Sequence, residues 1–373
     1  MNQQEYCQAI DWVIYLSACA VNDIVPDREK VSKMNLEQLY KAADDHMMTA
    51  VVCYALESAG IKDHAFIQAK FKSIRKVSAM ELDLLSIAEQ FEREKIWYVP
   101  LKGCVIKDYY PSIGLRQMSD FDLLFDETKA DKVKTIMEQL GFTCDEFGET
   151  HHDVYFKQPV SNFEMHRSLF SEFRTDLYKY YKDVFPKLIK DDDKNYGYHF
   201  SDEDLYVYLT AHEYKHYSKN GVGLRLLLDC YVFMNAKQDS LDRDNINKQT
   251  KKLGISDFER RRRELAMKVF SCENQTDLTE QEKQMLTEYS SIGVYGSFEN
   301  GIKNQLKNQS KFSFWVRNIF IPYKRMVKSV PFTRKSILLY PVGFVWRCGR
   351  MLFSERRVLV RTIKAVNKYG RKT

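Results

Sequence analysis

The chain has 373 residues, 44% hydrophobic and 29% charged, which is enough for one large domain or two to three small ones with real cores. Eight cysteines are scattered without a Cys-x-x-Cys pair, which favours a reduced cytosol over a disulfide framework. The first residues lack the basic start of a secretory signal, and the apolar run at 337–346 is too short to span a bilayer. We therefore expect a cytoplasmic protein with no transmembrane segment.

The first 95 residues have the pattern of packed helices. Apolar residues at three- and four-residue spacing predict three helices, over 5–24, 36–59 and 64–94. Asn35 and Asp63 precede the second and third and are suitable N-caps, and Gly60 ends the second. We expect an N-terminal helical region over residues 1–95.

The pattern changes at Trp97. Short β-rich runs predict strands over 97–101, 119–125, 142–147, 153–158 and 162–167. Helix-like segments at 103–110 and 128–140 separate the first three strands, and helical patterns return from about Asp202. We therefore expect a small α/β core over 96–200 and a C-terminal helical region over 201–373.

The first predicted strand runs into a helix at Lys102-Gly103. A helix N-terminus offers free N–H groups and a partial positive charge, and both suit a phosphate group. Glycine lets a phosphate approach the backbone closely. The alternative is that Gly103 stands at this turn for purely steric reasons.

Two carboxylates, Asp120 and Asp122, interrupt an apolar run that ends at Phe125. At positions i and i+2 of a strand they point to the same face, where they repel each other unless a cation lies between them. Mg²⁺ with a phosphorylated substrate is the commonest case. The alternative is that one of them caps a turn or pairs with Arg116.

A later predicted strand carries Glu164 and His166, which are again i and i+2. Three carboxylates from two neighbouring strands can hold two cations for an in-line displacement at phosphorus. Glu164 or His166 can also help to deprotonate an attacking hydroxyl. For His166 a structural hydrogen bond within the sheet is the favoured alternative.

These motifs resemble the DNA polymerase β-like nucleotidyltransferase superfamily, and within it the uncharacterised bacterial nucleotidyltransferase family. The likeness rests on L-K-G at 101–103, Tyr110-Pro111, Arg116, S-D-F-D-L-L at 119–124, Gly141-Phe142 and F-E-M-H at 163–166. It continues through L-x-x-H-x-x-x-H at 209–216, the stretch from Arg225 to Asp229 and the aromatic segment after Phe320, so it covers most of the chain.

The resemblance implies an α+β fold, with a small mixed-sheet nucleotidyltransferase core flanked by N-terminal and C-terminal helical regions. It also implies Mg²⁺-dependent transfer of a nucleoside monophosphate from an NTP, such as ATP, with release of pyrophosphate. Two Mg²⁺ ions are possible. The acceptor is open between a small molecule, a protein and an RNA.

The resemblance also implies roles for particular residues. Asp120, Asp122 and Glu164 would be the catalytic metal ligands. Lys102, Gly103, Cys104 and Arg116 would bind the nucleotide, and His166, His212, His216, Arg225 and Asp229 would line the pocket. One departure is that Cys104 follows Gly103, where the superfamily has Ser or a second Gly, and Cys is only a weak donor. Lys102 or Arg116 would then hold the phosphates, or the protein is a catalytically weak nucleotide-binding or regulatory protein that keeps the fold.

A competing motif is His212-Glu213-Tyr214-Lys215-His216, which matches the H-E-x-x-H pattern of zinc metalloproteases. On a helix both histidines fall on one stripe with Leu205 and Leu209, so we expect them to face the helical core. Asp229 is a merely possible third ligand. Structural histidines or a pocket role are favoured over a protease. We expect the run Arg260–Arg263 to be a solvated helix face.

Charge is distributed unevenly along the chain. Residues 311–373 carry sixteen Lys or Arg and one acid, a balance of +15, so the rest must sum to −9 within the net +6. We expect this basic end to fold back toward the acidic site and to contact phosphate or an anionic partner through Arg317, Lys324 and Arg325. A membrane surface and a solvated helix face are the alternatives.

Overall fold

The computed structural model describes residues 1–219, 221–272, 278–291, 302, 306, 310–353 and 356–369. The chain forms two units, Met1–Tyr214 with Gly223–Val294, and Lys215–Val222 with Tyr295–Thr373. The first unit holds the two regions expected first along the chain and part of the third. The three-part division into 1–95, 96–200 and 201–373 stays a prediction.

The N-terminal part of the first unit is helical, as expected. Its helices are α1 (Gln3–Val21), α2 (Arg28–Ser32), α3 (Leu36–Asp45), α4 (Thr49–Ser58) and α5 (His64–Arg93). The Asn35 side chain accepts a hydrogen bond from the N–H of Gln38, and Asp63 caps α5 in the same manner. The single helix expected over 36–59 is wrong, because Met47 has a φ of 53° and divides it into α3 and α4.

A five-stranded sheet forms the centre of the first unit. Its strands are β1 (Tyr98–Leu101), β2 (Phe121–Phe125), β3 (Thr143–Glu146), β4 (His152–Lys157) and β5 (Ser161–His166). Their order is β1-β2-β5-β4-β3, in which β2 and β5 are parallel and the other neighbours antiparallel. A second sheet pairs β6 (Leu188–Lys190) with β7 (Tyr198–Phe200). The mixed sheet with helical flanks confirms the expected α+β fold.

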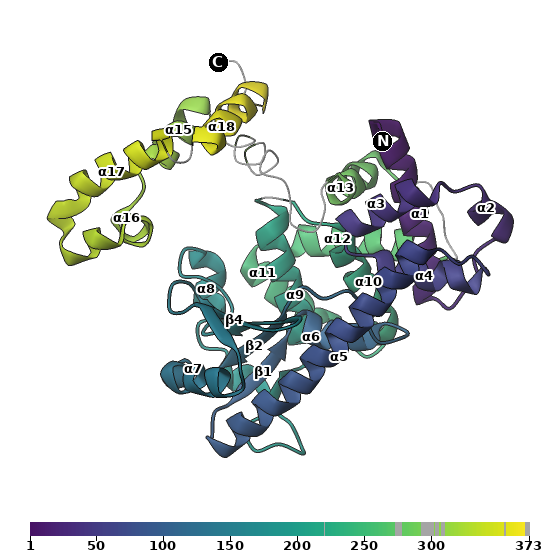
Figure 1. The fold of residues 1–373 in the computed structure, drawn as a ribbon, viewed down its shortest axis with the longest axis horizontal. Helices are drawn as coiled ribbons and strands as arrows, with labels where there is room; N and C mark the ends of the chain where they lie inside the picture. The colour runs from purple at the N-terminus through teal and green to yellow at the C-terminus, as the bar shows by residue number, and fades with distance from the viewer. Residues whose placement is uncertain are drawn as a thin grey trace. The chain divides into compact units, whose positions relative to one another are not determined.

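The side chains of β2 and β5 alternate between two faces of the sheet. Phe121, Leu123 and Phe125 of β2, with Phe163 and Met165 of β5, are fully buried in one core with residues of α5 and α7 (Ala130–Gln139). Figure 1 shows α5 and α7 beside the sheet. Because neighbouring residues of a strand point to opposite faces, the polar residues between these apolar ones point away from that core.

Short helices connect the strands, and longer helices follow the sheet. The connecting elements are α6 (Gly103–Ile106), η1 (Lys107–Tyr109), η2 (Glu127–Lys129), α8 (Thr175–Tyr181) and η3 (Phe185–Lys187). The later helices are α9 (Asp202–Tyr217), α10 (Leu224–Lys237), α11 (Arg243–Leu253), α12 (Ser256–Phe270) and α13 (Glu280–Ser290).

From residue 310 onward, the described part of the second unit consists of helices of 3 to 14 residues. They are α15 (Lys311–Ile319), α16 (Tyr323–Ser329), η4 (Pro331–Lys335), η5 (Ile337–Leu339), α17 (Tyr340–Phe353) and α18 (Arg356–Tyr369). Pro322 precedes α16, Pro331 begins η4 and Pro341 lies in the first turn of α17, where proline is tolerated. Among the described residues, none of the helices has the length and apolar character needed to cross a membrane.

Candidate active site

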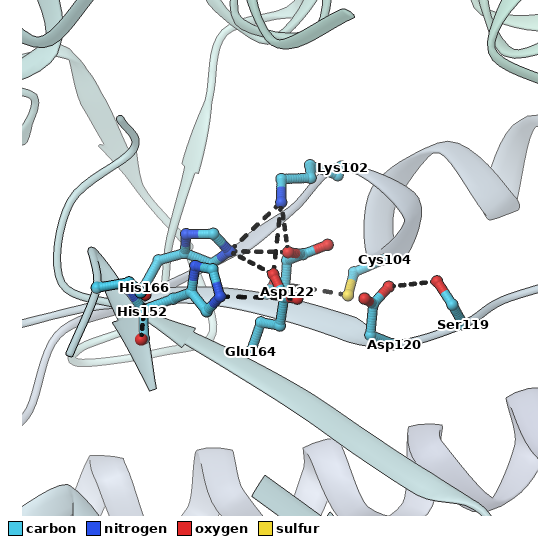
Figure 2. A network of polar contacts seen from close by, with 9 residues as sticks. Lys102, Cys104, Ser119, Asp120, Asp122, His152, Glu164 and His166 are labelled. Carbon is cyan, nitrogen blue, oxygen red and sulfur yellow. Dashed lines mark hydrogen bonds and ion pairs between the residues drawn. The ribbon is translucent and has the colours of Figure 1, made fainter. Parts of the chain in front are cut away.

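The register of two parallel strands brings a pair of acids together. Asp122 of β2 lies opposite Glu164 of β5, and Leu124 lies opposite His166. Both acids point to the face of the sheet that is turned away from α5 and α7. Figure 2 shows the carboxylates of Asp122 and Glu164 beside the imidazole of His166.

Lys102 supplies a cation to these acids. Its Nζ lies 2.5 Å from Oδ1 of Asp122 and 4.0 Å from Oε2 of Glu164 (Figure 2). Lys102 has φ 49° and ψ −119°, in a region that favours glycine, directly before the first residue of α6. Strained backbone of this kind costs about 1–3 kcal/mol and clusters at functional sites. Here it accompanies the ion pair that holds the Lys102 ammonium at the carboxylates.

Two histidines adjoin the acids. His166 Nε2 lies 2.8 Å from Asp122 Oδ1 and 3.5 Å from Glu164 Oε2. His152 pairs with His166 across β4 and β5, and its Nε2 lies 3.8 Å from Glu164 Oε1. The sequence argument missed His151 and His152. The sequence feature that points to them is the His-His pair directly before the strand predicted over 153–158.

The carboxylates differ in their pKa values. Burial alone raises the pKa of Asp122, but the Lys102 ammonium and the hydrogen bond with His166 outweigh it and hold that pKa below its usual range. For Glu164 the pKa is also lowered, since the hydrogen bond with His166 and the charge of Lys102 outweigh burial. Burial raises the pKa of Asp120, and the negative charges of Asp122 and Glu164 raise it further.

Asp120 lies apart from the closest ligand cluster. Its Oδ1 accepts a hydrogen bond of 2.7 Å from the Ser119 hydroxyl (Figure 2). Within the described ranges, two groups bring three potential metal ligands within 4.8 Å of one another. They are Asp122, Glu164 and His166, and the histidines His151, His152 and His166. Asp120 belongs to neither group, so its role as a metal ligand stays a prediction.

Arg116 forms a buried ion pair with Asp229 next to Gly103. Its Nε and Nη2 donate to the two carboxylate oxygens of Asp229 at 2.9 and 2.7 Å, and the Tyr110 hydroxyl donates to Asp229 at 2.8 Å. A Cβ on Gly103 would collide with the Arg116 guanidinium and would lie 2.5 Å from Cε of Met118. The close packing around position 103 therefore leaves no room for a side chain and accounts for the glycine at this turn. A phosphate-binding role for Arg116 and Gly103 stays a prediction.

Cys104 is the residue that departs from the pattern of the superfamily. It is buried, and its thiol lies 3.5 Å from the backbone oxygen of Asp122. Burial raises the pKa of the Cys104 thiol, and the negative charge of Asp122 adds to this effect. The thiol is therefore held protonated and directed at the backbone of β2.

Arg225 adds a second buried guanidinium close to Arg116. Its Nη1 donates to the backbone oxygen of Gln117 at 2.7 Å, but its buried Nε has no hydrogen-bond partner among the described residues. Burial lowers the pKa of Arg225, and the charge of Arg116 lowers it further, although Asp229 opposes this. Asp229 forms its ion pair with Arg116, and Arg225 senses the charges of both Asp229 and Asp120 with no ion pair to either among the residues described.

Tyr208 of α9 was not expected at the site. Its buried hydroxyl has no hydrogen-bond partner in the described part of the chain. Burial raises its pKa, while the Lys102 ammonium lowers it, so the phenol lies close enough to Lys102 to sense its charge. With Nδ1 of His152, Nδ1 of His166 and Nε of Arg225, the hydroxyl makes four buried polar atoms without partners around the acids. Such atoms are typical of a site that binds a polar ligand.

The H-E-x-x-H motif has a structural explanation. Glu213 is 3% exposed, its Oε2 lies 2.6 Å from Nε of Arg262, and its Oε1 accepts a hydrogen bond from Tyr289. Burial raises the pKa of Glu213 to about 7, against the opposing effects of Arg262 and Tyr289. Its carboxylate is therefore engaged within the core.

Two expectations about this region are wrong. Glu213 is the fully buried residue of the motif, whereas His212 and His216 are only half-buried, because the α9 face toward α12 passes through position 213. Arg262 is 2% exposed, so the arginine run is not a solvated face throughout. In the part of the chain that the structure describes, neither group of close metal ligands includes His212 or His216. The geometry gives no support to the zinc metalloprotease.

A mixed sheet with paired carboxylates on neighbouring parallel strands, beside a Lys-Gly turn into a helix, is the arrangement expected of a nucleotidyltransferase. Residues 32–271 match the model of a family described as uncharacterised nucleotidyltransferase, and the chain belongs to this family. The match confirms the resemblance seen in the sequence. No curated protein and no solved structure matches the chain.

Proposed function

We propose that the protein is a Mg²⁺-dependent enzyme that transfers a nucleoside monophosphate from an NTP to an acceptor and releases pyrophosphate. The observation that carries the proposal is the pairing of Asp122 with Glu164 on adjacent parallel strands, with Asp120 two residues before Asp122. The family match supports nucleotidyl transfer in general. The acceptor is a small molecule, a protein side chain or an RNA end.

The residues present fit a magnesium site. Carboxylate oxygens are the ligands that Mg²⁺ prefers, and Asp122, Glu164 and Asp120 supply them from two neighbouring chain segments. Asp122 is buried and Asp120 is half-buried, so nearby cations stabilise their charges. Mg²⁺ held by these residues would neutralise the triphosphate charge and align the displacement at phosphorus.

The remaining chemistry falls to side chains of the chain itself. Lys102 carries a charge beside the acids and would attract the phosphate oxygens of the NTP. An acceptor hydroxyl oxygen forms a bond to the α-phosphorus, while the bond from that phosphorus to the bridging oxygen breaks and pyrophosphate leaves. We assign the proton of the acceptor hydroxyl to Glu164 or His166, which lie 3.5 Å apart and close to Asp122.

One observation favours a second candidate function, a nucleotide-binding or regulatory protein with little turnover. Lys102 already neutralises Asp122 at 2.5 Å, and Cys104 stands where the superfamily has a stronger donor. A cation must compete with this ammonium to reach the carboxylates. Such a protein would bind NTP without releasing pyrophosphate.

Titration of the purified chain with Mg²⁺ and each of the four NTPs separates the two candidates. An enzyme releases pyrophosphate in a Mg²⁺-dependent manner when an extract supplies the acceptor. A binding protein gives saturable NTP binding and no pyrophosphate above that of the Asp122→Asn variant. Asp131→Asn, an exposed position on α7, is the matched control.

A further inference from the structure

Two imidazole nitrogens next to the acids lack the partner that a buried polar atom normally has. Nδ1 of His152 and Nδ1 of His166 are both buried and make no hydrogen bond within the described residues. His166 is only 1% exposed, so water does not readily satisfy its nitrogen. Nucleotidyl transfer as proposed above gives Nδ1 of His152 no function, and it uses His166 only as one of two candidate acceptors of the hydroxyl proton.

A third imidazole adjoins these two. One ring nitrogen from each of His151, His152 and His166 lies within 4.8 Å of the others, and the ring centroids of His151 lie 4.8 and 5.7 Å from those of His152 and His166. The ligand nitrogens of a tetrahedral zinc site are about 3.3 Å apart, given Zn–N bonds of about 2.0–2.1 Å. The rings would therefore rotate to bring nitrogens up to 4.8 Å apart onto one ion.

The backbone holds the three histidines in place. His152 and His166 are paired positions on β4 and β5. The carbonyl oxygen of His151 accepts hydrogen bonds from the N–H groups of Arg167 at 2.9 Å and Ser168 at 3.3 Å. The cluster thus stands on a sheet rather than on a loose loop.

The carboxylates provide outer support to the imidazoles. Figure 2 shows Nε2 of His152 and of His166 turned toward the acids, with the other ring nitrogen turned away from them. Metal-binding histidines usually donate their second ring N–H to a carboxylate, which fixes the tautomer and the ring orientation. Asp122 at 2.8 Å from His166 is in the right place for this role, and Glu164 lies 3.8 Å from His152.

We propose that His151, His152 and His166 bind a divalent transition metal, of which Zn²⁺ is the best fit, beside the carboxylates. Nitrogen ligands select zinc over Mg²⁺, which prefers oxygen. Three protein ligands leave a fourth position open, as in catalytic zinc sites. The proposal goes beyond the transfer reaction and needs no nucleotide.

The test measures Zn²⁺ affinity of the EDTA-treated full chain by competition with a chromophoric zinc chelator, in excess Mg²⁺ and without NTP. We expect His151→Gln and His152→Gln to bind Zn²⁺ at least tenfold more weakly than the wild type. Asp122→Asn, which removes the support of His166, should also weaken binding about tenfold or more. His199→Gln is the control, because His199 is exposed and pairs with Asp191. Equal affinity in the wild type and both histidine variants overturns the proposal.

The absorption spectrum of the Co²⁺-loaded wild type gives a second readout that no variant can confound by misfolding. Three nitrogens in a tetrahedral site predict visible bands without the near-ultraviolet band of cobalt thiolates. The eight free cysteines offer the competing ligands. A strong thiolate band, or no visible bands at saturating Co²⁺, contradicts the histidine site. Since no NTP is present, neither result depends on nucleotidyl transfer.

A separate observation concerns the surface of the second unit. Of the 25 large hydrophobic side chains that are exposed among the described residues, fourteen lie between Phe312 and Ile363. On α17 five of them form a stripe along one side of the helix, interrupted at Gly349 and made of Val342, Val345, Trp346, Leu352 and Phe353. The side chains of the stripe are well exposed, and Phe353 reaches 86% exposure.

The opposite side of α17 is the packed one. Gly343 is buried against Thr333, and the Cβ that it lacks would lie 3.5 Å from Sδ of Met326. Phe344 stacks on Phe320 at a centroid distance of 5.2 Å. Because this other side of α17 packs within its own unit, the exposed stripe is an additional apolar face.

The charge of the same region indicates the partner. The balance of +15 over residues 311–373 would repel a second copy of the unit and attract an anionic surface. An apolar helix face with Trp, flanked by many Lys and Arg, is typical of helices that lie in the interface of a membrane. At 14 residues, α17 and α18 are too short to span one.

We also infer that the second unit binds membrane surfaces that carry anionic lipids, through the α17 stripe. Sedimentation of the full chain with vesicles should show strong binding to phosphatidylcholine with phosphatidylglycerol, and weak binding to phosphatidylcholine alone. Binding should fall as salt rises. Val345→Ser with Trp346→Ser should weaken it at least tenfold. Leu82→Ser, which changes a 66% exposed leucine of α5, is the matched control and should not.

Several outcomes overturn this inference. Equal binding to neutral and anionic vesicles would contradict the attraction to anionic lipids. Equal binding of the wild type and the α17 variant would contradict a role for the α17 stripe. Binding to RNA with no binding to vesicles assigns the basic region to a nucleic acid. Loss of NTP affinity on charge reversal at Arg317 and Arg325, again without vesicle binding, assigns it to the acidic site.

Discussion

Lys102 and Asp122 form an ion pair of 2.5 Å in which both partners are largely buried, with side chains 16% and 6% exposed. The pair joins the last residue before α6 to the middle of the sheet. It places a cation where the proposed reaction needs one, and it also blocks the carboxylate that we expect to bind metal. The competition between these two effects underlies the first prediction.

Lys102→Met should make the stability of the protein less sensitive to acid. The pKa of Asp122 is lowered in the folded protein, so its contribution to stability is present above the unfolded pKa of about 4 and is lost as pH falls through the folded value. Without the ammonium, this contribution shrinks at neutral pH. Urea unfolding from pH 3 to 7 should show the largest difference between wild type and variant at neutral pH. A difference that grows toward low pH contradicts the assignment.

Asp122→Asn and Asp120→Asn should each remove Mg²⁺-dependent pyrophosphate release while the circular dichroism spectrum stays unchanged. Each substitution removes a negative charge that the metal requires and keeps the shape of the side chain. Asp131→Asn should retain full activity. If Asp120→Asn retains wild-type activity and Asp122→Asn does not, the metal is held by the closer group of Asp122, Glu164 and His166.

Gly103→Ala should destabilise the protein by about 1–3 kcal/mol, the usual cost of overpacking. The added methyl group would collide with Arg116, which its two bonds to Asp229 hold in place. Gly349→Ala is the control, because a Cβ there meets no atom within 4 Å. Chemical denaturation and NTP binding should be measured together. A loss of NTP affinity with unchanged stability would instead indicate that phosphate lies against Gly103.

Glu213→Ala should destabilise the protein by about 3–5 kcal/mol, since it leaves the buried charge of Arg262 without its partner. Urea denaturation measures the effect. Glu264→Ala, on the same helix as Arg262 but with its side chain 44% exposed, should change stability by less than about 0.5 kcal/mol. Stability close to that of the wild type for Glu213→Ala would reopen a catalytic role for the H-E-x-x-H motif.

The strands and the acids could be predicted from the sequence because they depend on local periodicity. Alternating apolar residues around Asp122 and Glu164 identify both strands and the shared face of their acids. The parallel pairing of β2 with β5, which sets the acids side by side, is a long-range property. Only the resemblance to a family implied it.

The partners of the buried charges could not be predicted, because they come from positions far apart in the chain. Arg116 pairs with Asp229 across 113 residues, and Glu213 pairs with Arg262 from another helix. His151 and His152 lie just before and at the start of a strand, and nothing local shows that they meet His166. The unusual φ of Lys102 likewise has no signature in the sequence, since lysine rarely adopts it.

Nucleotidyl transfer is tested most directly by following the α-phosphate of the NTP. The full chain is incubated with Mg²⁺, a cell extract and each NTP labelled at the α-phosphorus, beside the Asp122→Asn variant. The account predicts that label from at least one NTP becomes covalently attached to an acceptor, with one pyrophosphate released per label transferred. It also predicts that EDTA and the variant abolish both. Label that never leaves the nucleotide with any NTP, or transfer that is equal in the Asp122→Asn variant, contradicts the account.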